Sequence, residues 1–448
     1  MLAAAILGVS MDILLVNSPL FDKPGTQHED SLPPLGMGYL ATAVRNAGFD
    51  VELLDAVADD CGTAGVILAI QSFRPRFVGL NVFSTNLDLV QKIVTASFDA
   101  HVIIGGPAVR ALADIVLEWE TTNPITIIEG EAEHALPAFM KGQIAPQPWR
   151  GRMDRGIVRI DQDHSLFPRN IDLPLRRAFF KNEPVFDSAW NIREAHIITS
   201  RGCGHDCAFC AAARTVNQLP IRSRSLDDVR EEIEQLRILM PDMNGIRVID
   251  DLFIRNRKAI ERACRLFRDT GLSWRAMAHV NGFRGVDIAL YNEMKHSGCL
   301  ELFVGVESGS PARRKSIGKP VEIGPTLDMV ANLLRSGIAV KAYFILGFPG
   351  ETRQEMEDTY AVAKAMGVAA AQLGARFRAS VFKFRPYHGT RLYNELVASG
   401  AKIGKIAGDS QLAADSGRHQ FSFRGENYSC VDDATLNGLI CATQEIGA

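Results

Sequence analysis

The sequence predicts an α/β protein with two parallel-sheet domains: a Rossmann-like domain, then a partial (β/α)6 barrel, followed by a short C-terminal extension. Short runs of Val, Ile and Leu bounded by Gly or Pro recur along the first 140 residues and again after residue 192. Such runs, separated by helical stretches, are typical of parallel strands that are covered on both faces. A segment rich in Pro, Arg and Gly with little periodicity separates the two series and indicates a linker.

Length, charge and cysteine content limit the classes of protein to which the chain can belong. The chain has 448 residues and is 47% hydrophobic, enough for two or three domains with sizeable cores. Its net charge of −3 gives no electrostatic reason to expect nucleic acid or an anionic membrane as a partner. Five of the eight cysteines are scattered, unlike a disulfide framework, so we expect a reduced, cytoplasmic compartment. The apolar N-terminal stretch lacks a basic start and is interrupted by Asp12, so we expect a first buried strand, with residues 1–10 preceding a start at Met11.

The first domain is expected to span residues 11–140 as an open, doubly wound sheet. Its expected strands are at 12–17, 50–56, 77–83, 101–107 and 125–131, and its helices at 37–47, 62–73, 86–97 and 108–119. Ligands of such sheets bind outside the carboxyl ends of the strands. The residues that end the fourth and fifth strands form a potential site: Gly105, Gly106, Pro107, Glu129, Gly130 and Glu131. Glycines at strand ends are equally common in ordinary turns.

The second series is expected to form the partial barrel over residues 193–400, after a linker at 141–192. Its expected strands are at 195–200, 245–251, 274–280, 300–307, 340–348 and 379–385. Ser225 and Asp228 match a capping box at the start of one helix, and Cys264 falls on the apolar face of the next. Residues 401–448 are polar and irregular, and we assign them to the extension.

Three cysteines follow the first barrel strand, at the edge where parallel barrels place their sites. Cys203, Cys207 and Cys210 lie within eight positions of one another in "CGHDCAFC". They could bind zinc with His205 as a fourth ligand, although no second Cys or His pair follows nearby, or act as redox thiols. They could also bind a four-iron cluster, in which three thiolates leave one iron with an open coordination site.

"CGHDCAFC" is also the C-x3-C-x2-C motif of the radical S-adenosylmethionine (SAM) superfamily, with the aromatic Phe209 before the last cysteine. "VIDDLFIRN", "FVGVESGS", "FILGFPGET" and "FRPYHGTRLY" resemble its later strand motifs in the same order, although His388 stands where proline is common. The resemblance covers about 195–395 and implies that the three cysteines bind a [4Fe-4S] cluster. It also implies a set of SAM-binding residues: Phe209, Asp250, Asp251, Glu307, Ser308 and Gly347. Glu307, which would contact the ribose, could otherwise be a solvated carboxylate at a strand end.

The first domain is similar to the N-terminal cobalamin-binding domain of one large radical SAM subgroup. "PPLGMGYLATAVRNAGFDVELLD", "VIIGGPAV" and "IIEGEAEHAL" carry this resemblance. It implies cobalamin-binding residues after the third, fourth and fifth strands: Ser84, Thr85, Gly105, Gly106, Pro107, Gly130 and Glu131. His28 is not in the D-x-H-x-x-G motif that supplies a ligand to cobalt, so we expect no protein histidine on the metal. The alternative is a sheet without cofactor that is kept for packing.

The resemblance implies a cobalamin-dependent radical SAM enzyme, most often a methyltransferase that acts on an unactivated carbon through a deoxyadenosyl radical and methylcobalamin. One alternative is a cyclase or rearrangement enzyme that transfers no methyl group. Another is a corrinoid- or redox-binding regulator without turnover. The implied partners are a small natural-product or cofactor precursor and an external one-electron reductant of the flavodoxin or ferredoxin type, with no nucleic acid and no membrane. Further catalytic residues cannot be read from the sequence.

Overall fold

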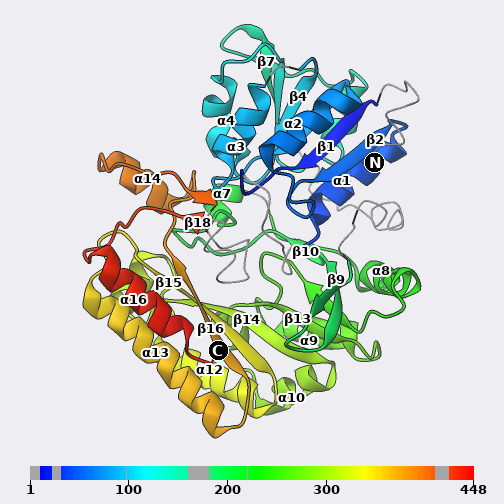
Figure 1. The fold of residues 1–448 in the computed structure, drawn as a ribbon. Coiled ribbons are helices and arrows are strands. Elements are labelled where there is room, and N and C mark those ends of the chain that lie inside the picture. Colours follow the sequence, from blue (N-terminus) through cyan, green and yellow to red (C-terminus); the bar gives the residue numbers. More distant parts are fainter. Residues whose placement is uncertain are drawn as a thin grey trace. The chain divides into compact units, whose positions relative to one another are not determined.

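In a computed structural model, the chain divides into two compact units (Figure 1). The first comprises Met1–Val185 and Lys405–Arg424, and the second Phe186–Gly404 and Gly425–Ala448. Within them, the structure describes residues 11–22, 32–96, 98–159, 180, 183–218, 220–408 and 423–447. The expected extension at residues 1–10 and His28 lie outside these ranges.

The first unit contains a seven-stranded sheet in the order β2-β1-β3-β4-β5-β7-β6. Its first five strands are parallel and agree with the expected ones: β1 (Ile13–Asn17), β2 (Val51–Asp55), β3 (Phe77–Asn81), β4 (His101–Gly105) and β5 (Ile125–Glu129). The strand order reverses between β1 and β3. Open sheets of this kind bind ligands at that reversal, outside the carboxyl ends of the strands.

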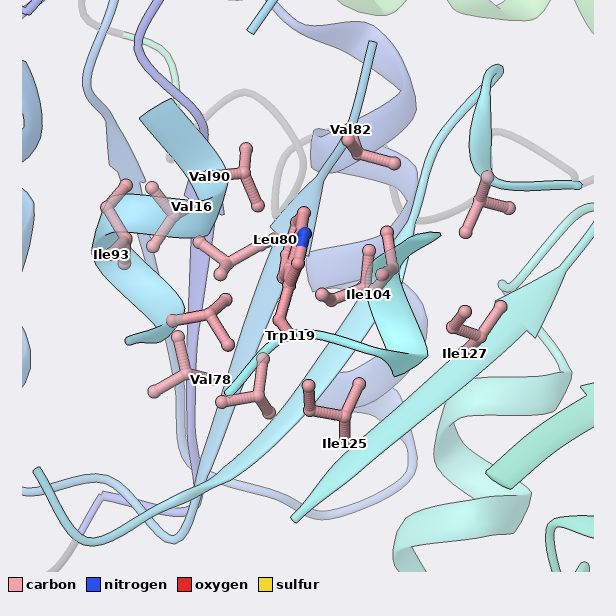
Figure 2. Close-up of a cluster of buried hydrophobic side chains, with 14 of the residues drawn as sticks. Val16, Val78, Leu80, Val82, Val90, Ile93, Ile104, Trp119, Ile125 and Ile127 are labelled. Carbon is pink, nitrogen blue, oxygen red and sulfur yellow. The ribbon is translucent and has the colours of Figure 1, made fainter. Parts of the chain in front are cut away.

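Helices cover both faces of this sheet and bury two hydrophobic clusters. On one face lie α1 (Leu35–Asn46) and α5 (Ala135–Met140). On the other lie α2 (Gly62–Phe73), α3 (Leu87–Val94) and α4 (Val109–Leu117). Figure 2 shows this second cluster, in which Val90 and Ile93 of α3 and Trp119 lie among the side chains of the strands. Burial on both faces explains why these strands read as continuous apolar runs in the sequence.

Part of the expected linker belongs to the first sheet. β6 (Gln147–Trp149) and β7 (Arg152–Arg159) lie at its edge, and β7 pairs in parallel with β5. The arginines of β7 conceal the strand in the sequence. Arg155 is nevertheless 1% exposed, because its guanidinium donates to the backbone carbonyls of Asn123 (2.5 Å) and Thr121 (2.9 Å).

The second unit contains a half-barrel of six parallel strands in sequential order. They are β9 (Ile192–Ile197), β12 (Gly245–Val248), β13 (Ser273–Ala278), β14 (Cys299–Glu307), β15 (Ala339–Leu346) and β16 (Phe377–Lys383). β8 (Val185–Asp187) lies beside β9 at one end of the sheet. This arrangement confirms the expected partial (β/α)6 barrel.

Helices between these strands cover the outer face of the half-barrel (Figure 1). They are α8 (Leu226–Leu239), α9 (Arg257–Phe267), α10 (Ile288–His296), α12 (Ile323–Arg335) and α13 (Arg353–Gln372). Ser225 caps α8 as expected, but Asp228 does not complete a capping box, because its carboxylate accepts from Arg224 (2.6 Å) instead. Cys264 is fully buried on α9, which confirms its place in the core.

The C-terminal extension contains a helix, α16 (Asp433–Gln444), that packs against β16 and α13. The amide of Val381 in β16 donates to the Gln444 side chain (2.7 Å), and that of Ala379 donates to the Ile446 carbonyl (3.1 Å). The extension therefore covers the edge strand of the half-barrel. Among the described residues, no helix is both long and apolar enough to cross a membrane.

Candidate active site

The three cysteines lie on one loop after β9. Two backbone bonds tighten the loop, from the Cys210 amide to the Cys207 carbonyl (3.1 Å) and from the Ala208 amide to the Ile317 carbonyl (2.9 Å). Ala208 is buried among apolar side chains, and the Phe209 ring packs on Phe348 with their centroids 5.8 Å apart. The apolar residues of the motif thus anchor the loop to the barrel.

Two glycines allow the cysteine loop to approach its neighbours closely. Gly202 has φ +92°, and a Cβ there would lie 3.0 Å from the Pro220 carbonyl oxygen. Gly318 has φ +77°, and its Cβ would lie 2.7 Å from the Asp206 carbonyl oxygen. Side chains at either position would push the loop away from the barrel edge.

All three thiols are partly buried, and none forms a disulfide. Burial raises the pKa of all three thiols. The pKa of Cys207 rises to about 11 and that of Cys210 to about 12, and the pKa of Cys203 also rises. The thiolates are therefore unfavourable here unless a bound cation compensates their charge. In the described part of the chain, no three His, Cys, Asp or Glu side chains are grouped to hold a single metal ion.

Two histidines stack beside the cysteine loop. The rings of His205 and His279 are 3.9 Å apart at 15°, and His279 follows β13. Burial lowers the pKa of both, that of His279 to about 2, and the nearby Lys319 charge lowers them further. Both imidazoles are therefore neutral at pH 7.

The two aspartates that follow β12 have different environments. Asp250 is buried, and its carboxylate accepts from the Thr199 amide (2.6 Å), the Thr199 hydroxyl (2.7 Å) and the Ser200 hydroxyl (2.6 Å). It ties the ends of β9 and β12 together. Asp251 is exposed and accepts from the Gly202 amide (3.1 Å), next to the first cysteine.

Glu307 ends β14 in the left-handed region, with φ +67°, beside a register shift relative to β15. It is 7% exposed, and its Oε1 accepts from the Lys319 ammonium at 2.9 Å. It is therefore not the solvated carboxylate that the sequence left open. Both charges act on the Cys207 thiol, so the pair lies within electrostatic reach of the cysteine loop.

Ser308 and Gly347 serve the packing of their own segments. The Ser308 hydroxyl is fully buried and lies 3.2 Å from the Thr359 hydroxyl on α13. Gly347 has φ +87°, and a Cβ there would lie 3.1 Å from Leu436 of α16. Its amide donates to Glu351 (2.7 Å).

At the carboxyl edge of the first sheet, side chains form a ladder across β2, β1 and β3. The Asn17 amide donates to Asp55 (2.8 Å), and the Asn81 amide donates to the Asn17 side-chain oxygen (2.9 Å). The Asn81 oxygen in turn accepts from the Ser18 amide (2.7 Å). Burial raises the pKa of Asp55. This polar edge lies at the strand reversal.

The expected cobalamin residues lie along the same edge. Ser84 is buried after β3, and Thr85 beside it is half-buried. At Gly105 a Cβ would meet only the Ile128 carbonyl, at 3.9 Å, so the edge is open there. Gly106 has φ +109°, and its Cβ would lie 2.8 Å from backbone atoms of Val82. Three more residues are at least partly exposed: Pro107, Gly130 and Glu131.

Sequence reasoning missed three residues of the barrel site. Lys319 and His279 lie outside the recognised motifs, and nothing in the sequence pairs them with Glu307 or His205. Glu351 stands in "FILGFPGET", and its Oε2 accepts from the Gly347 and Phe348 amides (2.7 and 3.0 Å). An acid four residues after a strand-end glycine was a signal that could have identified it.

Comparisons with known proteins agree with this two-part arrangement. The model of the radical SAM superfamily matches residues 197–363, and the model of the B12 binding domain matches residues 26–140. An uncharacterized methyltransferase of Pyrococcus horikoshii is 28% identical, over 87% of this chain and 84% of that protein. Cytidylyl-2-hydroxyethylphosphonate methyltransferase of Streptomyces wedmorensis is 24% identical, over 82% and 78%. Anaerobic magnesium-protoporphyrin IX monomethyl ester cyclase of Cereibacter sphaeroides is 22% identical, over 79% and 60%.

Solved structures share the fold. The radical SAM methyltransferase TsrM from Kitasatospora setae, with cobalamin and a [4Fe-4S] cluster bound, has a TM-score of 0.58 at 18% identity, covering 87% of this chain and 75% of that one. The cobalamin-dependent radical SAM enzyme OxsB has a TM-score of 0.64 at 14% identity, covering 96% and 65%. The chain belongs to the radical SAM superfamily, as an enzyme whose radical SAM domain follows an N-terminal B12-binding domain.

Proposed function

We propose that the chain is a cobalamin-dependent radical SAM methyltransferase that acts on an unactivated carbon of a small molecule. The observation that carries the proposal is the cysteine loop at the carboxyl edge of the half-barrel, within electrostatic reach of the buried Glu307–Lys319 pair. Two of the relatives named above are methyltransferases, which supports methyl transfer.

The residues of the barrel site fit a [4Fe-4S] cluster and SAM. Cys203, Cys207 and Cys210 would hold three irons of the cluster. Glu307 would bind the SAM ribose through the carboxylate oxygen that Lys319 does not contact. A cluster held there would supply the electron that cleaves a carbon–sulfur bond of SAM. The chain itself holds the cysteine loop against the barrel by packing Phe209 on Phe348.

The edge of the first sheet fits a flat cofactor. Gly105 offers a place without side chains, and Ser84 and Thr85 offer hydroxyls near the strand reversal. Cobalamin supplies a carrier for a methyl group. We also propose that no protein histidine binds the cobalt of cobalamin. The absence of the D-x-H-x-x-G motif from the sequence supports this. His28 lies outside the described residues.

The second candidate is a cyclase or rearrangement enzyme, favoured by the similarity to the Cereibacter cyclase. The intact cysteine motif and the buried Glu307 argue against a regulator without turnover. We also propose an external one-electron reductant of the flavodoxin or ferredoxin type and a cytoplasmic location. All eight cysteines are free thiols, which supports a reducing compartment.

Anaerobic turnover with SAM that carries a CD3 group tests the proposal. The full chain, loaded with cluster and cobalamin, is incubated with reductant and candidate substrates, and the products are followed by mass spectrometry. We expect 5′-deoxyadenosine and a substrate that gains one CD3 group. The control replaces Cys203, Cys207 and Cys210 with alanine and should lose both products and the cluster absorbance.

Other outcomes of this experiment contradict the proposal. Deoxyadenosine together with a changed substrate that lacks CD3 would favour the cyclase or rearrangement class. A cluster-loaded chain that forms no deoxyadenosine with any candidate substrate would favour the regulator. A triple variant that keeps its cluster would overturn the ligand assignment.

A further inference from the structure

A segment of the C-terminal extension lies against the turn that follows β15. Two backbone bonds join the two segments. The Gly350 amide donates to the Tyr428 carbonyl at 2.9 Å, and the Cys430 amide donates to the Glu351 carbonyl, also at 2.9 Å. The Asn427 side chain shapes the segment, because it accepts from the backbone two residues ahead and donates to the backbone four residues ahead. The extension therefore presents a preformed backbone edge to the turn.

The Tyr428 ring extends this contact into the core beside the cysteine loop. It meets the Phe384 ring edge to face, with the centroids 6.0 Å apart at 84°. Phe384 packs on Phe348 at 5.3 Å, and Phe348 packs on Phe209 of the cysteine motif at 5.8 Å. Phe348 and Phe384 are no more than 1% exposed. A chain of four rings thus connects the extension to the residue that precedes Cys210.

The phenol group gives Tyr428 a third anchor. Its oxygen accepts from the Gly404 amide at 3.1 Å. Ala401 and Ile403, just before Gly404, pack on the same hydrophobic cluster as the Tyr428 ring. The residue is therefore fixed by its backbone, its ring and its hydroxyl, and each of the three contacts reaches a different segment of the second unit.

The turn that Tyr428 contacts lies at the carboxyl edge of the half-barrel. It follows β15, which pairs with β14, and β14 ends at Glu307. Glu351 closes the turn from within, because its Oε2 accepts from the Gly347 and Phe348 amides. In the proposed function, SAM lies along this edge between the cysteine loop and Glu307. The turn and the cysteine loop would therefore border the same ligand.

We propose that Tyr428 is a positioning residue for SAM, which holds the turn at 347–351 and the cysteine loop in the relative position that SAM binding requires. The inference rests on the proposed function, because it assumes that the cluster and SAM occupy this edge. Edge-to-face ring contacts are directional, and a close-packed core passes the displacement of one ring to the next. Loss of the Tyr428 ring therefore loosens the turn and Phe348 together. The C-terminal extension is thus part of the SAM site.

SAM binding to the cluster- and cobalamin-loaded full chain, without substrate, tests the inference. Titration gives the SAM affinity, and electron paramagnetic resonance of the reduced cluster gives the signal change that SAM causes. We expect Tyr428→Ala to keep its cluster but to bind SAM about threefold to tenfold more weakly. Its SAM-loaded signal should be broader than that of the natural chain, because the ligand takes more than one position. Tyr428→Phe keeps the ring and should restore both readouts.

The matched control is Tyr360→Ala on α13. Tyr360 is also half-buried, and its ring lies 6.0 Å from the Lys364 ammonium. This variant should bind SAM as the natural chain does. Where Tyr428→Ala fails to load a cluster, Tyr428→Leu, which keeps more of the side-chain volume, is measured by the same criteria.

Three outcomes would overturn the inference. The first is an unchanged SAM affinity in the variant that lacks the Tyr428 ring. The second is an equal loss in Tyr360→Ala, which would indicate general destabilisation. The third is a loss in Tyr428→Phe as large as that in Tyr428→Ala, because phenylalanine keeps the ring contacts.

The CD3 experiment is read separately from these measurements. A natural chain whose cluster signal does not respond to SAM contradicts the proposed function and this inference with it. A natural chain that binds SAM but transfers no CD3 group contradicts only the proposed methyl transfer, and the Tyr428 variants still decide the inference.

Discussion

Glu307 combines backbone strain, burial and a charged partner in one residue. A non-glycine residue at φ +67° occupies a region that costs of the order of 1–3 kcal/mol. The register shift between Gly305 and Glu307 accompanies this conformation. Lys319 then holds one carboxylate oxygen, while no described residue bonds to the other. The residue is thus fixed in place with one oxygen available to a ligand.

Replacing Glu307 by glutamine should weaken SAM binding to the cluster-loaded chain by about tenfold or more. The amide keeps the shape but loses the charge that strengthens hydrogen bonds from hydroxyl groups. Cluster content should not change. Lys319→Gln breaks the same ion pair but keeps the carboxylate, so it should cost less affinity. If SAM affinity is unchanged in Glu307→Gln, Glu307 does not contact SAM and its role is limited to the ion pair with Lys319.

A second buried acid predicts a pH dependence. Burial raises the pKa of Glu351 to about 7, although the Phe348 and Gly347 amides oppose the shift. Its Oε1 is buried without a hydrogen-bond partner in the described structure. Because the folded pKa lies above the unfolded one, this contribution to stability is complete below about pH 4.5. It is lost as the pH rises through 7, by about 3 kcal/mol at most.

Glu351→Gln should remove this dependence, because the amide stays neutral at every pH. Urea unfolding of both chains between pH 5 and pH 8 measures it. We expect the free energy of unfolding of the natural chain to fall more steeply with rising pH than that of the variant. Equal slopes would show that Glu351 is ionised in the folded protein throughout this range.

At the scale of elements, β14 depends on a glycine beneath its functional acid. A Cβ on Gly305 would lie 2.7 Å from the Lys319 ammonium and would overlap Glu307 Oε1. The strand can therefore seat the buried ion pair only where it carries no side chain. The same strand also supplies Glu301 and Phe303 to the inner face of the half-barrel. β14 therefore contributes side chains both to that face and, through Glu307, to the carboxyl edge.

Gly305→Ala should displace the Glu307–Lys319 pair, lower the free energy of unfolding by about 1–2 kcal/mol and weaken SAM binding. Gly324→Ala on α12 is the matched control, because no atom lies within 4 Å of its Cβ. That change should leave SAM binding intact and stabilise the helix by up to about 1 kcal/mol. Thermal unfolding and SAM titration measure both effects. Equal behaviour of the two variants would contradict the role of Gly305.

At the scale of the whole molecule, the C-terminal segment contributes to both units. Lys405–Arg424 belongs to the first unit, and Gly425–Ala448 to the second. In the second unit, α16 lies beside β16 and α13 (Figure 1). Its Leu436 is fully buried with Leu346 and Met356. An uncovered edge strand invites pairing with other chains, so this helix protects the half-barrel from association.

A chain that ends at Val431 should therefore aggregate and unfold at a lower temperature. Light scattering after size-exclusion chromatography and thermal unfolding test this. Leu436→Ala keeps the helix and leaves the strand edge covered. It should lower the free energy of unfolding by about 2–5 kcal/mol. A shortened chain that remains monodisperse with an unchanged unfolding temperature would show that α16 has no protective role.

Much of this architecture could be predicted from the sequence. The first five strands of the first sheet and all six half-barrel strands were expected, because strands buried on both faces read as apolar runs between Gly and Pro. β7 was missed, because its arginines hide the alternation, and so was α16. The cysteine loop and Glu307 could be identified because their motifs are contiguous in the sequence.

The sequence alone determined the first five strands of the first sheet, the six half-barrel strands, the cysteine motif and the superfamily, because local periodicity and contiguous motifs carry that information. Only the tertiary structure decided which distant side chains meet. The pair of Glu307 with Lys319, the stack of His205 on His279 and the position of Arg247 over Phe303 each join residues from different elements. Such contacts arise when strands align side by side, and no spacing along the chain encodes them.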